Sequence, residues 1–436
     1  MRAETPIKRA LSIRDIPNAF KATPLDDRDM AEFYEDTMLV RTGQAGESPI
    51  KDIYEGCCEL QERNAYLLMG HMGCGKSTEL NRLAKRLRDE GYPVRVVYCS
   101  AELDRANMEY TDVLILMADA LLSLAEETGR TPDKSDLEKI RTFWNVRTER
   151  ERIEDKSEQI QAEAGVGGAL RGLLEVFFSI KSSLKYDVEK RTVYREQIVR
   201  RGSDWLGAIN RVADCLSTPD GKRPILIFED LDKGDTWNIF HGHCEMLTGM
   251  SFPVVYTFPI AYYYEPAFND LSAFFSETCN LPMIKTRTIE GEPFEEGRAA
   301  LRAIIERRTD PSLFEDGVID SLIDRTGGCL RHLFQAITKS AVLAKRLSKP
   351  KITMELADRA LMEIKSNLSA RVEGKEHDFL VEIARGKHKK IENKPMLLHM
   401  MQALAVLEYN GERWYNVHPL MEEYLREIKM LPPKQQ

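Results

Sequence analysis

The chain has 436 residues, of which 43% are hydrophobic and 30% charged, and its formal net charge is −8. A chain of this length is too long for one ordinary core, so we expect a globular protein of two or three domains. The acidic balance excludes a protein that binds nucleic acid through its overall charge, and any such contact must come from a local basic patch.

The N-terminal sequence MRAETPIKRALSIRDIP has no apolar core after its basic residues, so we expect no signal peptide. The eight cysteines are scattered along the chain, which is unlike a disulfide framework. Both observations favour a reducing, cytoplasmic setting. Residues 1–48 are polar and are expected to wrap the following domain, and the helical spacing of apolar residues from Ser48 to Arg63 predicts a helix that leads into the first strand.

An apolar run from Ala65 to Met69 is followed by GHMGCGKST, in which a glycine, four residues and Gly-Lys-Ser match a phosphate-binding loop. Glycines let several backbone N–H groups curl around a polyphosphate, and the helix expected from Ser77 to Asp89 directs its positive end at the anion. Lys76 would reach the β and γ phosphates of ATP, and the Ser77 hydroxyl would be a Mg²⁺ ligand. The predicted nucleotide-binding residues are Gly70, Gly73, Cys74, Gly75, Lys76, Ser77 and Thr78.

A second strand is predicted from Val94 to Cys99, so strand, helix and strand form a βαβ unit and the sheet should be parallel. A helix is expected from Tyr110 to Ala125. Between about residues 126 and 216 no strand is predicted, and we expect a helical insert. Its charged part, 147–163, reads as a solvated helix or a mobile segment, and Tyr194 to Leu216 as a helix. Residues 165–184 fit an amphipathic helix better than a membrane span, although contact with a membrane surface stays open as the less favoured alternative.

Acidic residues follow the short apolar strand predicted from Pro224 to Phe228, in the run Glu229-Asp230-Leu231-Asp232. We expect this parallel strand to lie next to the phosphate loop, where its tip would supply carboxylates to Mg²⁺. Glu229 is predicted to be the Mg²⁺ ligand, and Asp230 to polarise the attacking water. Solvated turn residues are the alternative interpretation.

A polar residue, Thr257, lies near the tip of the next predicted strand, Phe252 to Phe258. It would point at the γ phosphate if that strand lies beside the acidic one, although threonine is also simply a good strand former. One more strand is predicted from Asn280 to Thr286. Beyond it the predicted helices are 295–308, 311–326 and 331–347, and the Gly327-Gly328 break puts Arg331 at a helix start, where the helix dipole does not favour it and a ligand-facing role is indicated.

In this order, the phosphate loop, the acid-tipped strand LIFEDLD, Thr257 and the Gly-Gly-x-x-Arg helix resemble AAA+ ATPases, especially the origin-recognition, STAND and KAP branches. The resemblance covers about residues 50–350. It implies that Thr257 is the first sensor residue and that Arg331 is the second, reaching the γ phosphate from a helical lid. Ring-forming members usually carry Asp then Glu at the acidic motif, whereas this chain has Glu229 then Asp230, which puts the hydrolysis rate in doubt.

The C-terminal residues 375–436 are expected to form a small domain, with a helix from Pro395 to Leu404. Two strands, 405–409 and 413–417, flank Asn410-Gly411, a strong hairpin signal. Helices followed by a hairpin resemble a winged-helix module, which in related ATPases binds DNA or packs as a lid. The run of residues 385–390 is the densest basic segment and is the candidate DNA contact, although a short charge run is more often a solvated surface.

The predicted fold class is therefore α/β, with a parallel-sheet P-loop core of the AAA+ type, a helical lid and a C-terminal winged-helix-like domain. The predicted divisions are an N-terminal wrapping segment 1–48, the core 49–290, the lid 291–374 and the C-terminal domain 375–436. The predicted function is a switch ATPase that uses ATP and Mg²⁺ to move the lid, to form a homo-oligomer or to engage DNA or a protein effector, in bacterial defence or DNA transactions. The alternatives are a nucleotide-locked scaffold with little hydrolysis and, third, a small-molecule kinase.

Overall fold

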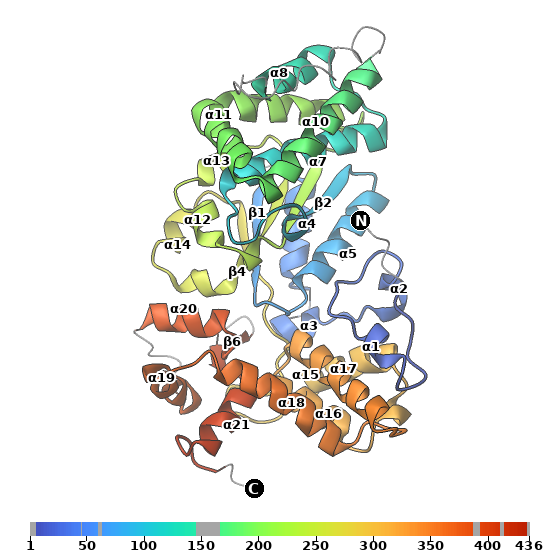
Figure 1. The fold of residues 1–436 in the computed structure, drawn as a ribbon, viewed down its shortest axis with the longest axis vertical. Coiled ribbons are helices and arrows are strands. Elements are labelled where there is room, and N and C mark those ends of the chain that lie inside the picture. The colour runs from blue at the N-terminus through green and yellow to red at the C-terminus, as the bar shows by residue number, and fades with distance from the viewer. Residues whose placement is uncertain are drawn as a thin grey trace.

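The computed structural model describes residues 6–44, 46–59, 63–144, 166–386, 393–409 and 414–433. A five-stranded sheet of order β2-β3-β4-β1-β5 lies in its middle, and every neighbouring pair is parallel. Figure 1 shows this sheet between a group of helices at one end of the molecule and two further groups at the other end. The strands are β1 (Ala65–Gly70), β2 (Val94–Tyr98), β3 (Ile225–Glu229), β4 (Val254–Pro259) and β5 (Glu277–Asn280).

In the sheet order, β4 lies between β1 and β3. The acid-tipped strand is therefore not the neighbour of the phosphate-loop strand. Both β3 and β4 are apolar and almost entirely buried, so their sequences do not indicate which of them pairs with β1.

The structure corrects the prediction for the last strand. The prediction placed it at 280–286, but β5 ends at Asn280. Pro282 has no N–H to donate to a ladder, and beyond the sheet Met283 forms an isolated bridge with Tyr409 of the C-terminal residues.

The inner strands of the sheet are buried on both faces, and β1, β3 and β4 each contribute to two apolar clusters. On β1, Tyr66 and Leu68 belong to one apolar cluster, which also contains residues of the helices α4 and α5. Ala65, Leu67 and Met69 belong to the other, which contains most of the long helix α7. Successive side chains of a strand point to opposite faces of the sheet. Because both faces of β1 are buried, its residues are apolar throughout.

Local capping sets where the core helices begin. Ser48 accepts a hydrogen bond from the Lys51 amide at the start of α4, with Pro49 at the first helical position, and Glu109 and Asp112 form a capping box for α7. The helix predicted to Arg63 ends at Cys58. The helices of the N-terminal residues and of the core are α1 (Ile16–Ala19), α2 (Met30–Phe33), α3 (Met38–Thr42), α4 (Pro49–Cys58), α5 (Lys76–Asp89), α6 (Cys99–Glu102) and α7 (Tyr110–Thr128).

The described part of the predicted insert is helical, and its helices lie at one end of the molecule in Figure 1. Leu170, Leu173 and Phe177 of α10 are buried, and the Phe177 ring stacks on Trp205 of α11, which agrees with the amphipathic prediction. Among the described residues, we find no helix of the length and apolar character that crossing a membrane requires. The charged segment 147–163 lies outside the described residues. The helices are α8 (Lys134–Trp144), α10 (Val166–Tyr186) and α11 (Val188–Leu216).

Helices follow the sheet, as predicted, but the expected helix 311–326 is divided by Gly317, which adopts a left-handed conformation. Short elements after β3 and β4 are η1 (Leu231–Lys233), α12 (Thr236–Phe240), α13 (Cys244–Thr248), η2 (Ile260–Tyr264) and α14 (Phe268–Ser272). The helices of residues 291–374, here called the lid helices, are α15 (Glu295–Arg308), η3 (Pro311–Leu313), α16 (Val318–Thr326), α17 (Leu330–Arg346) and α18 (Met354–Ser369).

The C-terminal residues contain two helices followed by the predicted antiparallel hairpin, and then a further helix. Trp414 and Tyr415 of the hairpin are buried, in agreement with a packing role. Asn410-Gly411 and residues 387–390 of the basic run lie outside the described residues. We call α19 (Lys375–Ala384), α20 (Lys394–Gln402), β6 (Val406–Tyr409), β7 (Trp414–Val417) and α21 (Pro419–Glu427) the C-terminal domain. The α/β fold with a parallel core, helical lid and C-terminal domain is confirmed.

Candidate nucleotide-binding site

The glycine-rich loop leaves the sheet at the carboxyl end of β1 and leads directly into α5. Gly73 and Gly75 have φ angles of +82° and +110°, which side chains rarely tolerate. These conformations turn the chain so that the first amides of α5 face the loop. The loop therefore has the backbone arrangement that binds phosphate groups.

Lys76 lies at the centre of this loop and is 5% exposed. Its Nζ donates to the carbonyl oxygens of Gly70 at 2.9 Å and His71 at 3.0 Å, and lies 2.8 Å from an Asp232 carboxylate oxygen. Burial lowers the pKa of Lys76, but the Asp232 carboxylate raises it above its ordinary value, so the side chain stays an ammonium ion. The sequence analysis gave Asp232 no role, although it belongs to the acidic run.

Ser77 and Glu229 come together as predicted for a Mg²⁺ site. The Ser77 hydroxyl donates to Oε2 of Glu229 at 2.5 Å, while Oε1 of Glu229 is buried with no hydrogen-bond partner among the described residues. Burial, together with Asp232, raises the pKa of Glu229 to about 7. A hydroxyl and a carboxylate with one unused buried oxygen form an oxygen donor set of the kind Mg²⁺ prefers, so these residues fit the ion.

Asp230 follows Glu229 in the chain, but its carboxylate has different partners. Its backbone is left-handed, with φ +68°, and its carboxylate accepts hydrogen bonds from the Ser100 hydroxyl and the Lys233 ammonium. A non-glycine residue in this conformation is uncommon and often marks a functional turn. Asp230 therefore lies beside the Mg²⁺ candidate Glu229, but its oxygens are paired within the protein.

Thr257 is completely buried on β4, which does lie beside β3. Its hydroxyl donates to the Phe228 carbonyl at 3.3 Å and accepts from the Leu231 amide at 3.2 Å. Both partners belong to the acid-tipped strand and its turn. In this structure the Thr257 hydroxyl therefore fixes the turn that carries Glu229 to Asp232.

Arg331, in the first turn of α17, lies directly against the phosphate loop. A Cβ atom added to Gly73 would come within 2.5 Å of the Arg331 Cβ. The buried Nε of Arg331 has no hydrogen-bond partner among the described residues. The close approach depends on Gly328, where a Cβ would meet the Ile284 carbonyl at 1.7 Å. The Gly-Gly break thus lets the lid pack closely enough to bring a cation to the loop.

The N-terminal residues form another wall of the site, which the sequence did not predict. Arg41 is 2% exposed, and its Nη2 donates to the Cys74 carbonyl at 2.8 Å. Leu25 donates its amide to Thr78 Oγ1 at 3.3 Å and accepts a hydrogen bond from Asn81 at 2.9 Å. A single arginine without a motif around it looks the same in the sequence whether it is buried or exposed. The sequence therefore does not indicate that Arg41 contacts the phosphate loop.

These walls enclose a cavity of about 160 Å³. Its lining includes charged residues of the phosphate loop, of the turn after β3 and of the lid, namely Lys76, Asp232, Lys233 and Arg331. The lining also includes apolar residues of the kind that contact a planar base, namely Pro24, Leu25, Phe33, Ile304 and Phe334.

A parallel α/β sheet with a phosphate-loop sequence after β1 and acidic residues after β3 is the arrangement of the P-loop class of folds. No protein-family model matches the chain, and no curated protein matches its sequence. Solved structures of similar fold are AAA+ ATPases of the origin-recognition and RuvB types.

Three of these structures give the degree of similarity. ORC2 of Aeropyrum pernix, in ADPNP–ADP complexes, has a TM-score of 0.39 and 12% identity over 93% of this chain and 98% of that one. Drosophila ORC bound to DNA has a TM-score of 0.39 and 11% identity over 92% and 80%. A RuvB variant of Thermotoga maritima has a TM-score of 0.35 and 11% identity over 87% and 92%. The class stated above rests on the sheet order and the loop.

Proposed function

We propose that the protein binds Mg²⁺-ATP in this cavity and acts as a switch ATPase. The proposal rests on one observation. Lys76 of the phosphate loop and Arg331 of the lid line the same cavity, beside the hydrogen-bonded pair Ser77 and Glu229. The phosphates would lie along the loop, with Mg²⁺ held by Ser77 and Glu229. Arg331 would contact the terminal phosphate, so the nucleotide state would bias the position of the lid.

Mg²⁺ would neutralise charge on the phosphates and polarise the reacting phosphoryl group. Asp230 would orient the attacking water once Ser100 and Lys233 release its carboxylate. Lys76 holds the phosphates from inside the loop, and Asp232 keeps its ammonium in place before they bind. Thr257 fixes the turn on which these acids depend.

The second candidate function is a nucleotide-locked scaffold that binds ATP and barely hydrolyses it. The pairing of Asp230 with Ser100 and Lys233 favours this alternative, because a paired carboxylate polarises water poorly. Engagement of duplex DNA through the C-terminal domain, self-assembly and docking of a protein effector are proposed as the outputs of the switch, whether in bacterial defence or in DNA transactions.

The deciding experiment measures phosphate release from Mg²⁺-ATP by the purified protein, with and without duplex DNA, beside the Lys76→Ala variant. Turnover that requires Lys76 supports the switch ATPase, and an increase with DNA supports a DNA-coupled output. ATP binding without release supports the scaffold. Failure of the wild-type protein to bind ATP overturns both.

A further inference from the structure

The second residue of the phosphate loop, His71, inserts its ring into the C-terminal domain. The ring is almost fully buried, and its Nε2 accepts the Glu408 amide proton of β6 at 2.8 Å. It also forms a hydrogen bond with the backbone of Met401, at the end of α20. Because Nε2 is an acceptor, the neutral ring carries its proton on Nδ1, which is the nitrogen left for Met401. Burial, with the nearby Lys76, lowers the pKa of His71 to about 3 and keeps the ring neutral.

The same residue is joined to the phosphate-binding lysine through its backbone. The His71 carbonyl accepts a hydrogen bond from Lys76 Nζ at 3.0 Å. One residue therefore links the ammonium ion that would hold the phosphates to a strand that lies 337 positions later in the sequence. A histidine that only filled space in the loop would need neither of the two ring hydrogen bonds.

The strand that His71 contacts is itself fixed to the core. The Glu408 side chain is completely buried and accepts hydrogen bonds from Tyr264 and Asn280, each at 2.8 Å. The Glu408 carbonyl accepts the Met283 amide proton at 3.2 Å. The partner of His71 is thus held rigidly, so a shift of the loop relative to β6 would strain the two ring hydrogen bonds.

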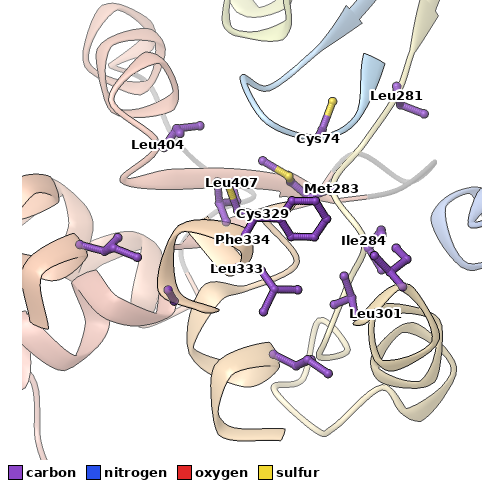
Figure 2. Packing of buried hydrophobic residues seen from close by; sticks show 14 of the residues in the cluster. Cys74, Leu281, Met283, Ile284, Leu301, Cys329, Leu333, Phe334, Leu404 and Leu407 are labelled. Atoms are coloured by element: carbon purple, nitrogen blue, oxygen red, sulfur yellow. The ribbon is translucent and has the colours of Figure 1, made fainter. Parts of the chain in front are cut away.

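The next residue on this strand connects to the lid. Tyr409 donates its hydroxyl to the Gly327 carbonyl at 3.0 Å, just before the helix that carries Arg331. Figure 2 shows side chains of the phosphate loop (Cys74), the lid (Cys329) and β6 (Leu407) gathered in one apolar cluster. The β6 strand therefore contacts both the phosphate loop and the lid, the two structures that would close on the phosphates.

We propose that His71 is a positioning residue that couples phosphate binding at Lys76 to docking of the C-terminal domain. The loop conformation that docks the ring is the one that directs Lys76 into the cavity, so phosphate binding and domain docking stabilise each other. The two effects are equal by thermodynamic linkage. Docking of the C-terminal domain strengthens nucleotide binding by the same factor as bound nucleotide strengthens docking. The inference rests on the proposed nucleotide binding.

Three variants separate this role from simple packing. His71→Gln keeps one donor and one acceptor on the side chain, whereas His71→Leu fills space without hydrogen bonds. His399→Leu is the matched control, because His399 is an exposed residue of α20 that pairs with Glu376. Hydrogen–deuterium exchange of residues 406–409 would be measured for each protein with and without Mg²⁺-ADP, alongside ADP affinity. Residues 419–427 of α21 serve as the internal reference.

In the wild-type protein, Mg²⁺-ADP should slow exchange at residues 406–409 by about tenfold, the effect of one or two hydrogen bonds. His71→Leu should abolish the slowing and weaken ADP binding by a similar factor, His71→Gln should restore part of both, and His399→Leu should behave as wild type. Equal slowing in His71→Leu, or none in a wild-type protein that binds ADP, would overturn the coupling.

The comparison without nucleotide is independent of the proposed function. There, His71→Leu should expose the Glu408 amide and speed its exchange, and unchanged exchange would overturn the docking role of His71. If the wild-type protein does not bind ADP, the coupling as proposed fails, and the separate ATP-binding measurement decides the proposed function. The nucleotide-free comparison would still show whether His71 holds the C-terminal domain.

Discussion

The Nζ of Lys76 lies 2.8 Å from a carboxylate oxygen of Asp232, and both side chains are more than 90% buried. An anion thus already neutralises the ammonium ion at the position where a phosphate would bind. The pair has two consequences that can be separated by experiment. It keeps a buried charge compensated in the nucleotide-free protein, and it competes with the phosphates for Lys76.

Replacing Asp232 should therefore increase the dependence of stability on nucleotide. In Asp232→Asn the buried ammonium loses its partner, which should destabilise the nucleotide-free protein by about 3–5 kcal/mol. Bound ADP would restore a negative charge, so the rise in Tm on adding ADP without Mg²⁺ should be larger than in the wild type. Asp235→Asn, which removes an exposed carboxylate three residues later, is the control. An equal or smaller rise in Asp232→Asn would contradict this role.

Substitutions of the two acidic residues at the end of β3 should impair different steps, Mg²⁺-dependent binding for Glu229 and turnover for Asp230. Glu229→Gln removes the buried carboxylate beside Ser77, so the Mg²⁺-dependent part of ATP binding should fall by at least the roughly 10- to 100-fold seen when a supporting ligand contact is lost. Asp230→Asn should leave Mg²⁺-ATP binding intact and lower turnover by about 10²- to 10⁴-fold. Calorimetry with and without EDTA, together with phosphate release, measures both. The same defect in both variants would mean that these roles are wrongly divided.

Arg331 should matter for nucleotide binding more than for folding. Its Nε has no partner in the described part of the chain, so Arg331→Ala leaves no acceptor unsatisfied. Loss of a charge-assisted hydrogen bond to phosphate should weaken ATP binding by about 10- to 100-fold, with little change in the Tm of the nucleotide-free protein. Arg346→Ala, at the exposed far end of the same helix, is the matched control. Unchanged ATP affinity in Arg331→Ala would remove Arg331 from the site.

The sequence was sufficient for the parts of the site that are local. The phosphate loop, its helix and the acid-tipped strand follow from spacing and apolar patterning within a few residues, and the structure brings Ser77 and Glu229 together as expected. The order of β3 and β4 could not be predicted, because two strands buried on both faces have the same pattern. Arg41 and the His71–Glu408 hydrogen bond depend on segments far apart in the chain, and short-range patterns hold no information about such contacts.

A buried histidine pair joins the lid to the C-terminal domain and should make stability depend on pH. His332 Nδ1 lies 3.0 Å from His418 Nε2, and His418 Nδ1 accepts the Leu420 amide proton. Burial lowers the pKa of His332 to about 4, with Arg331 and Arg371 adding to the effect, and lowers that of His418 well below its ordinary value. Both rings are therefore neutral in the folded protein at neutral pH.

Below pH 6.5 the unfolded chain protonates these two side chains before the folded protein does. The unfolded state then binds more protons, so the free energy of unfolding should fall as the pH drops from 6.5 towards 4. The loss should be up to about 1.4 kcal/mol per pH unit for each histidine. Urea unfolding at several pH values measures the slope. In His332→Leu/His418→Leu, which keeps the site apolar, the slope should decrease by the contribution of both rings. An unchanged slope would show that the pair does not titrate on unfolding.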